Sequence, residues 1–310
     1  MDPIDIRNED LGAGAAFFGA FLCVLFGANA VAIKVSLQGL GPFTTAGLRF
    51  SLAAVIILLW ALGTGRRVGV SRDQLGPLLI LSFIFTSQLS LFYLGLSRSN
   101  ASRGTLLANL QPFFTLFLAH FFIPGDRITR RKLFGILLGF SGVACVFMEK
   151  KGGGTGDLRI GDLIILVATF LWAINAVYIK RVISYFNPYQ IVMYQMIFAT
   201  PIFFLEALLW DQQMIFHPDM KVIGALLYQT VITAAFGFLA WTYLMQRYGT
   251  VALHSFIFIM PIAGVVLGGI VLDEPITWKI LLALGFIVAG ILMVHFKPDK
   301  RLVPPIFYKG

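Results

Sequence analysis

The sequence predicts an all-α integral membrane protein with ten transmembrane helices, arranged as two inverted five-helix repeats. Composition is the first observation behind this prediction. Hydrophobic residues make up 58% of the chain and charged residues 13%, with a mean hydropathy of +0.85, whereas soluble domains carry about 25% charged residues. The second observation is a set of ten long apolar runs, and the third is a pair of similar segments in the two halves. A water-exposed globule could not bury this much apolar surface.

Each apolar run is long enough to span a bilayer as a helix, because about 20 residues rising about 1.5 Å each cross roughly 30 Å of hydrocarbon. Most runs lack the two-residue alternation of a barrel strand. The predicted spans are residues 12–37, 42–63, 76–97, 100–122, 131–148, 160–184, 188–210, 221–246, 250–272 and 277–296. They divide the chain into a first repeat (12–148), a Gly-rich linker (149–159), a second repeat (160–296) and a tail (297–310).

The two halves resemble each other at a fixed offset. Residues 26–34 (FGANAVAIK) and 172–180 (WAINAVYIK) lie 146 residues apart and are identical at five of nine positions. The next run opens with Pro42 in one half and Pro188 in the other, at the same offset. Since five helices per half is an odd number, the second repeat must enter the bilayer from the opposite side. The repeats are therefore predicted to be inverted, as in many secondary transporters.

Loop charges predict the orientation. With the N-terminus inside, 15 Lys and Arg residues fall on the cytoplasmic side and 7 on the other, while Lys34 and Arg49 lie within spans. This bias predicts a multi-pass protein of the cell inner (plasma) membrane with both termini in the cytoplasm. No basic cluster precedes the first run, so we expect no signal or transit peptide and a first helix that stays in the mature protein.

Several functional classes are disfavoured by residue content. The net charge of +9 is spread over membrane-flanking loops, which argues against nucleic-acid binding. Cys23 and Cys145 both fall inside spans, where we expect them to pack, and they offer no disulfide framework or Cys-rich metal site. No P-loop is present, so ATP-driven transport is not expected. We expect no cofactor, no metal site and no catalytic residues.

Two prolines mark the predicted cavity. Pro112 and Pro261 lie near the middle of their spans, where each is expected to deprive the carbonyl four residues earlier, on Ala108 or Ile257, of its helical partner. Kinked backbone at membrane depth is tolerated against protein or a polar cavity. Neighbouring helices could equally repair such a kink. Both interpretations direct these segments toward the bundle interior.

Polar and aromatic residues inside the spans supply the other cavity candidates, because amides facing lipid are costly. Amides beside aromatic rings suit a small amphipathic solute. In the alternative interpretation the amides link helices and the rings form interfacial belts. The candidates for the substrate cavity are Asn29, Gln88, Tyr93, Asn109, Pro112, Trp172, Asn175, Tyr178, Tyr243, His254 and Pro261.

Three cations are candidates for a charged gate: Lys34, Arg49 and Lys180. The two lysines lie near helix ends, so they could also snorkel to the interface. Arg49 is about seven residues inside its span, and we expect it to pair with helix-end carbonyls or a carboxylate. A carboxylate or phosphate on a solute could use any of the three.

Together these motifs resemble the EamA-type exporters of the drug/metabolite transporter superfamily. The resemblance covers residues from about 12 to 296 and depends on one combination of short motifs. These are Asn29 with Lys34, Asn175 with Lys180, Pro42 before Arg49 and Phe50, Asp126 with Thr129, and Glu274 with Thr277. It implies ten helices in two inverted repeats around a central cavity. It also implies export of amino acids or related metabolites.

Other functions stay open on the sequence. The solute could belong to another class, such as nucleotide sugars or drug-like cations, and a lipid scramblase or a non-transporting scaffold would share the fold. A membrane-embedded enzyme is disfavoured, because no His-Glu-x-x-His or Gly-x-Ser-x-Gly motif is present and the four histidines are scattered. Proton coupling, facilitated diffusion and antiport are not distinguished. The Gly135/Gly139 and Gly264/Gly268 pairs fit close packing within a monomer or across a homodimer.

Overall fold

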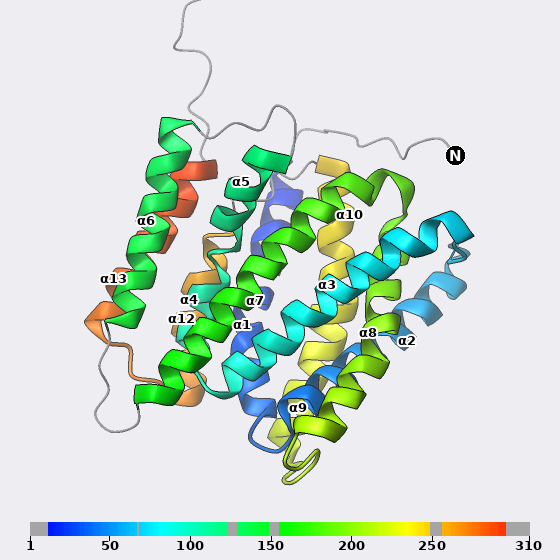
Figure 1. Cartoon of the computed structure of the whole chain (residues 1–310), viewed down its shortest axis with the longest axis horizontal. Coiled ribbons are helices and arrows are strands. Elements are labelled where there is room, and N and C mark those ends of the chain that lie inside the picture. The colour runs from blue at the N-terminus through cyan, green and yellow to red at the C-terminus, as the bar shows by residue number, and fades with distance from the viewer. Residues whose placement is uncertain (1–11, 67, 123–128, 149–154, 249–255, 296–310) are drawn as a thin grey trace, which may run out of the picture.

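The computed structural model describes residues 12–66, 68–122, 129–148, 155–248 and 256–295, and these residues form a helical bundle (Figure 1). The helices are α1 (Ala13–Ser36), α2 (Pro42–Gly63), α3 (Arg72–Ser97), α4 (Ala101–Ala108), α5 (Gln111–Phe122), α6 (Arg130–Phe147), α7 (Thr155–Val182), η1 (Ile183–Tyr185), α8 (Pro188–Trp210), α9 (Met220–Leu227), η2 (Tyr228–Gly237), α10 (Phe238–Tyr248), α12 (Ile259–Leu272) and α13 (Trp278–His295). No strand occurs in the described part of the chain, which confirms the all-helical prediction.

Seven helical segments are long and apolar enough to cross a membrane. Five are single helices, and two are composite: α4 with α5 (Ala101–Phe122) and α9 with η2 and most of α10 (Met220–Met245). The three other predicted spans overlap the shorter helices α6, α12 and α13, and residues 250–255 of the predicted span 250–272 lie outside the described residues. Large apolar side chains such as Phe17, Phe83 and Ile270 are exposed on the outside of the bundle, as expected of a lipid-facing surface. The chain is therefore a multi-pass membrane protein.

The two prolines break their segments differently. Helix α4 ends at Ala108 and α5 begins at Gln111, so Pro112 lies in the first turn of a new helix, where a missing N–H costs little. Pro261 is the third residue of α12, not the middle of a longer helix among the described residues. The Ile257 carbonyl accepts a hydrogen bond from the Met260 amide at 2.9 Å, so it is not left without a partner as the sequence suggested.

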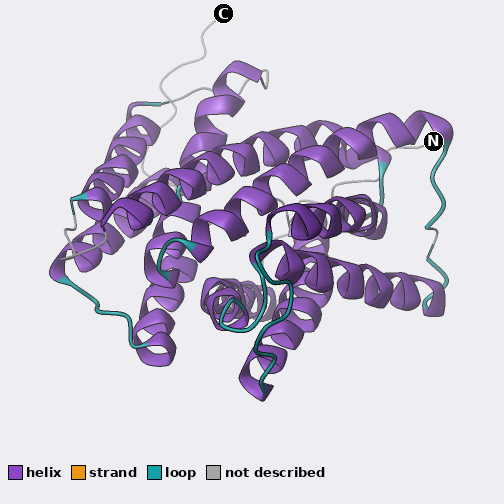
Figure 2. Cartoon of the chain, turned by 60° about the horizontal axis from the view of Figure 1, so that its bottom comes forward, coloured by secondary structure: helices purple, strands orange, loops and turns teal. Residues whose placement is uncertain are grey.

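The two halves interlock rather than forming separate domains. The main helix pairs each join one helix of the first half to one of the second: α1 with α12, α2 with α8, α3 with α7, and α6 with α13. Figure 1 shows α6 beside α13 at one edge of the bundle, and Figure 2 shows the same bundle turned by 60°. The most extensive helix pairs therefore join the two halves.

Helices α1 and α7 run in opposite directions. The Lys34 ammonium, near the end of α1, donates to the Leu96 carbonyl near the end of α3. Ser99, two residues after α3, donates to Asp162 near the start of α7 at 2.6 Å. The end of α1 and the start of α7 therefore lie at the same end of the bundle, as inverted repeats require.

Glycines bring α6 and α13 into close contact. A Cβ atom added at Gly135 would lie 2.9 Å from the Gly290 carbonyl oxygen, and one added at Gly290 would lie 2.6 Å from that of Gly135. Gly264 and Gly268 likewise face Thr105 and Ser102 of α4. These glycines pack within the chain, so the described part of the molecule uses them for helix contacts inside the bundle.

Candidate functional site

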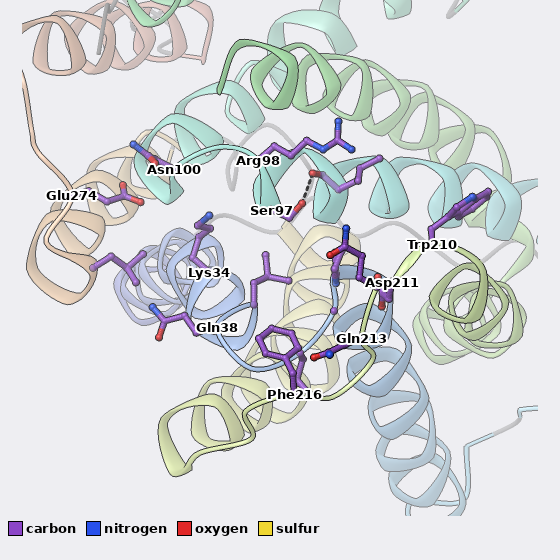
Figure 3. A pocket seen from close by; sticks show the side chains of 17 residues that line it. Lys34, Gln38, Ser97, Arg98, Asn100, Trp210, Asp211, Gln213, Phe216 and Glu274 are labelled. Atoms are coloured by element: carbon purple, nitrogen blue, oxygen red, sulfur yellow. Dashed lines mark hydrogen bonds between the residues drawn. The ribbon is translucent and has the colours of Figure 1, made fainter. Parts of the chain in front are cut away.

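A pocket of about 710 Å³ opens at the end of the bundle where α1, α3, α8 and α12 end and where α2 and α4 begin (Figure 3). Its charged and aromatic lining residues are Lys34, Arg98, Asp211, Glu274, Trp210 and Phe216. The loop charges predict that this end faces outward. The pocket thus combines two cations, two carboxylates and two aromatic rings contributed by both halves of the chain.

Asp211 and Glu274 bind the N-termini of helices in the other half. Asp211 accepts hydrogen bonds from the Thr44 amide at 2.8 Å and the Thr44 hydroxyl at 2.7 Å, at the start of α2. Glu274 accepts from the amides of Ala101 at 2.6 Å and Ser102 at 2.8 Å, at the start of α4. Negative charge at a helix N-terminus is stabilising because the first amides have no partner within the helix. Two second-half carboxylates therefore hold first-half helices beside the pocket.

Lys34 is half-buried and projects, in the view of Figure 3, between Glu274 and Asp211. Its ammonium donates to the Leu96 carbonyl at 3.1 Å, and this carbonyl also accepts from the Ser99 amide at 3.3 Å, just after the end of α3. Arg98 lies further out and is exposed. Of the three predicted gate cations, Lys34 is the one that lines this pocket.

A buried polar network centres on Arg49, whose residue is 2% exposed. Its Nη1 donates to the Tyr93 hydroxyl at 3.0 Å and its Nη2 to the Thr233 hydroxyl at 3.0 Å. The Tyr93 hydroxyl in turn donates to Gln229 Oε1 at 3.0 Å. In the described residues, hydroxyls thus replace the helix-end carbonyls or carboxylate expected from the sequence.

The network extends from η2 to α1. Gln229 Nε2 donates to the Ser36 hydroxyl at 2.7 Å and to the Ala32 carbonyl at 3.2 Å. The Thr233 hydroxyl lies 3.0 Å from Asn29 Oδ1 and 2.8 Å from the Gln229 carbonyl, and it can donate to either. Four segments, α1, α2, α3 and η2, are therefore joined, and the predicted residues Asn29, Arg49 and Tyr93 come together in one place.

This network lies deeper in the bundle than the pocket, and its residues do not line the pocket. Pro42 lines the pocket, and Arg49 lies seven residues further along α2, about 10 Å deeper. Leu94 also lines the pocket, whereas its neighbour Tyr93 is fully buried. The Arg49 network therefore lies behind the pocket wall formed by the start of α2 and the end of α3.

The buried amides away from this network have unused hydrogen-bonding atoms. Gln88 and Asn175 are each 3% exposed, and the side-chain oxygen of each has no hydrogen-bond partner among the residues that the structure describes. Gln195 Nε2 is likewise unpartnered. Buried polar groups without partners are rare and costly, which distinguishes these positions from ordinary helix contacts. They are not part of the pocket lining.

The other predicted site residues are dispersed. Trp172 and Tyr178 are half-buried on α7, and Tyr178 packs on an apolar cluster containing Leu78 and Phe186. Asn109 donates to the Thr105 carbonyl of its own helical segment. Tyr243 is 55% exposed and Lys180 is exposed at the end of α7; Pro112 and Pro261 are buried; His254 and Asp126 lie outside the described residues.

Several residues of the site had weak sequence signals. Ser36 and Thr233 look like ordinary small polar residues of membrane helices, and nothing in the sequence distinguishes them. The amide of Gln229 inside a span was a signal, since such a group needs a partner away from lipid. Asp211 was missed because it directly follows a predicted span, and only the folded arrangement brings it to the start of α2.

Comparisons with known proteins agree with this architecture. The chain is 28% identical over 286 residues to a probable amino-acid metabolite efflux pump of Escherichia coli, covering 88% of this chain and 92% of that protein. A Salmonella typhimurium protein of the same description is 27% identical, with 90% and 94% covered. An uncharacterized transporter of Archaeoglobus fulgidus is also 27% identical, with 89% and 96% covered.

A protein of known crystal structure has the same fold, with a TM-score of 0.69 at 16% sequence identity and coverage of 91% of this chain and 96% of that one. The sequence profile of the EamA-like transporter family matches twice, at residues 13–148 and 159–296, which are nearly the two predicted repeats. Two copies of this domain, an all-helical membrane bundle and relatives named as transporters lead to one conclusion: the chain belongs to the EamA-like transporter family.

Proposed function

We propose that this protein is a secondary transporter that exports amino acids or related small metabolites across the cytoplasmic membrane. It would work by alternating access, with ten helices in two inverted repeats and both termini in the cytoplasm. The observation that carries the proposal is the pocket of mixed charge, which lies above a buried polar network; both are built from residues of the two halves. The efflux-pump names of two relatives support the same solute class.

The pocket chemistry fits a zwitterion. Lys34 and Arg98 offer positive charge for a carboxylate, while Asp211 and Glu274 offer negative charge for an ammonium group. Part of each carboxylate's charge is already balanced by helix amides, which favours exchangeable binding over a tight ion pair. Trp210 provides an aromatic surface for an apolar side chain.

Alternating access requires the two halves to move against each other on one side of the membrane. At the pocket end, the contacts between halves include the Asp211 and Glu274 hydrogen bonds to α2 and α4. Deeper in the bundle, Arg49 joins α2 to η2 through Thr233. Changes in these polar contacts would alter access from the outer side, while apolar helix pairs such as α6 and α13 could move as units.

The face of α7 that carries Trp172 and Asn175 remains a proposed part of the central passage. The unpartnered oxygen of Asn175 supports this assignment, because a passing solute could supply the missing donor. Asn175→Ala and Trp172→Ala should therefore reduce transport while folded protein remains in the membrane. Wild-type flux in both variants, at equal expression, would remove this face from the passage.

The test is efflux of a panel of radiolabelled amino acids from proteoliposomes containing the purified protein, with and without an imposed pH gradient. Saturable release of some members is expected, and the response to the gradient decides proton coupling. A fluorescent-lipid flipping assay on the same vesicles distinguishes a carrier from a scramblase. Lipid flipping without solute release, from folded protein, would refute the proposal.

A further inference from the structure

Arg49 is a buried cation without a counter-ion among the described residues. Its partners are the neutral hydroxyls of Tyr93 and Thr233, and its Nε has no hydrogen-bond partner within the described part of the chain. The guanidinium lies 4.8 Å from the centre of the Phe50 ring and 5.9 Å from that of Phe238. Ring faces attract a cation but do not neutralise its charge. An arginine keeps its charge in proteins, so within the described bundle this positive charge is not compensated by a carboxylate.

A second buried arginine, Arg103, has a carboxylate partner and serves as a comparison for Arg49. Arg103 pairs with the carboxylate of Asp162, and Asp162 also accepts a hydrogen bond from Ser99. The side chains of Arg103 and Asp162 are 7% and 0% exposed. Burying a charge without its partner is strongly destabilising. A purely structural role therefore accounts for Arg103 but not for Arg49.

The surroundings of Arg49 allow an anion to replace the present partners. Both partners are neutral hydroxyls, so no ion pair has to break. Thr233 and Gln229 lie on η2, a π-helical segment, and such segments are frequent at functional sites. The chain of hydrogen bonds from Arg49 through Tyr93 and Gln229 ends at Ser36, beside the pocket-lining Leu37.

We infer that Arg49 is the anion-binding residue of the transport pathway and that it receives the carboxylate of the solute. A carboxylate presents two oxygens, which match the unused Nε–H and a neighbouring Nη–H of a guanidinium. Tyr93 and Thr233 are positioning residues that hold the guanidinium while no solute is bound. This inference rests on the proposed function and narrows it, because the transported solutes must carry a carboxylate.

The first experiment compares solutes that differ only in this group. Each transported amino acid is tested against its decarboxylated amine and its amide as competitors of efflux in proteoliposomes. The wild type should be inhibited by the acid about tenfold more strongly than by the amine or amide, as expected for one charge-assisted contact. Equal inhibition by all three would overturn the role of Arg49 and leave the proposed transport function standing.

The second experiment compares variants of the two buried arginines. Arg49→Gln should weaken binding of carboxylate solutes by about tenfold or more, Arg49→Lys by less, and Arg103→Lys should behave as wild type. Thermal unfolding in detergent separates binding from folding. Arg49→Gln should unfold no earlier than wild type, because it removes an unbalanced charge, whereas Arg103→Gln should unfold earlier, because it leaves Asp162 unpaired. Earlier unfolding of both would assign Arg49 a structural role.

Binding can also be measured without transport, because a ligand that binds only the folded protein raises its unfolding temperature. Acids that stabilise the wild type but not Arg49→Gln would support the anion site even if no solute were released from vesicles. In that case the proposed function fails while the site stands. No stabilisation and no release would overturn both.

Discussion

Helix α4 is capped across the two halves by Glu274, and replacing this residue tests that arrangement. The N-cap residue of α4, Asn100, makes no side-chain capping hydrogen bond, and Glu274 instead accepts from the first two amides at 2.6 and 2.8 Å. Loss of a cap costs about 0.5–2 kcal/mol, and a hydrogen bond to a charged group contributes about 1.5–3 kcal/mol. Glu274 is half-buried beside the pocket, so water can replace part of this loss.

We therefore expect Glu274→Ala to lower the free energy of unfolding by about 1–2 kcal/mol, which is a factor of about 5–30 in the ratio of folded to unfolded protein. Glu274→Gln keeps one acceptor oxygen, so it should lower the free energy of unfolding by about half as much as Glu274→Ala. Asn100→Ala is the matched control and should stay within about 0.5 kcal/mol of wild type. Reversible unfolding in mixed detergent micelles measures all three. Equal losses in Asn100→Ala and Glu274→Ala would refute the assignment of the cap to Glu274.

Three further predictions concern packing, charge and orientation. Gly290→Ala should destabilise the fold by about 1–3 kcal/mol, whereas Gly285→Ala on the same helix, with no atom within 4 Å of the added Cβ, should be tolerated; detergent unfolding of both variants checks this. Asp162→Asn should lower the free energy of unfolding by about 3–5 kcal/mol, because it leaves the buried Arg103 guanidinium without its anion. The same assay measures this, and a decrease below about 1 kcal/mol would contradict the prediction. In a cysteine-free background, Gln213→Cys should react with a membrane-impermeant maleimide on intact cells and Asp73→Cys should not; the reverse labelling would invert the orientation.

Much of the fold was predictable because membrane helices are long and uniformly apolar. Helices α2 and α8 begin at Pro42 and Pro188 and end at Gly63 and Trp210, at the boundaries expected from the sequence. Proline is favoured in the first turn of a helix, so Pro42 and Pro188 allowed the first residue of each helix to be predicted. The π-helical geometry of η2 was not predictable, since hydropathy does not encode the hydrogen-bond register within a helix.

The candidate site was less predictable, because it is made where the ends of helices meet. The sequence identified Arg49 by its depth in a span and Tyr93 and Asn29 as polar groups needing partners, and the structure brings the three together. It gave no sign that Asp211 lies at the start of α2, 167 residues away along the chain. Such contacts depend on the packing of the two halves, which no local pattern records.

The pairing of each helix with one from the other half has a consequence for biogenesis. Four helices of the first half are synthesised before the helices that they mainly contact. The pairs are α1 with α12, α2 with α8, α3 with α7, and α6 with α13. Contacts between residues far apart in sequence form slowly. Until η2 arrives, Arg49 lacks Thr233 as its hydrogen-bond partner. The newly inserted first half therefore holds polar side chains inside the bilayer before the second half supplies their partners.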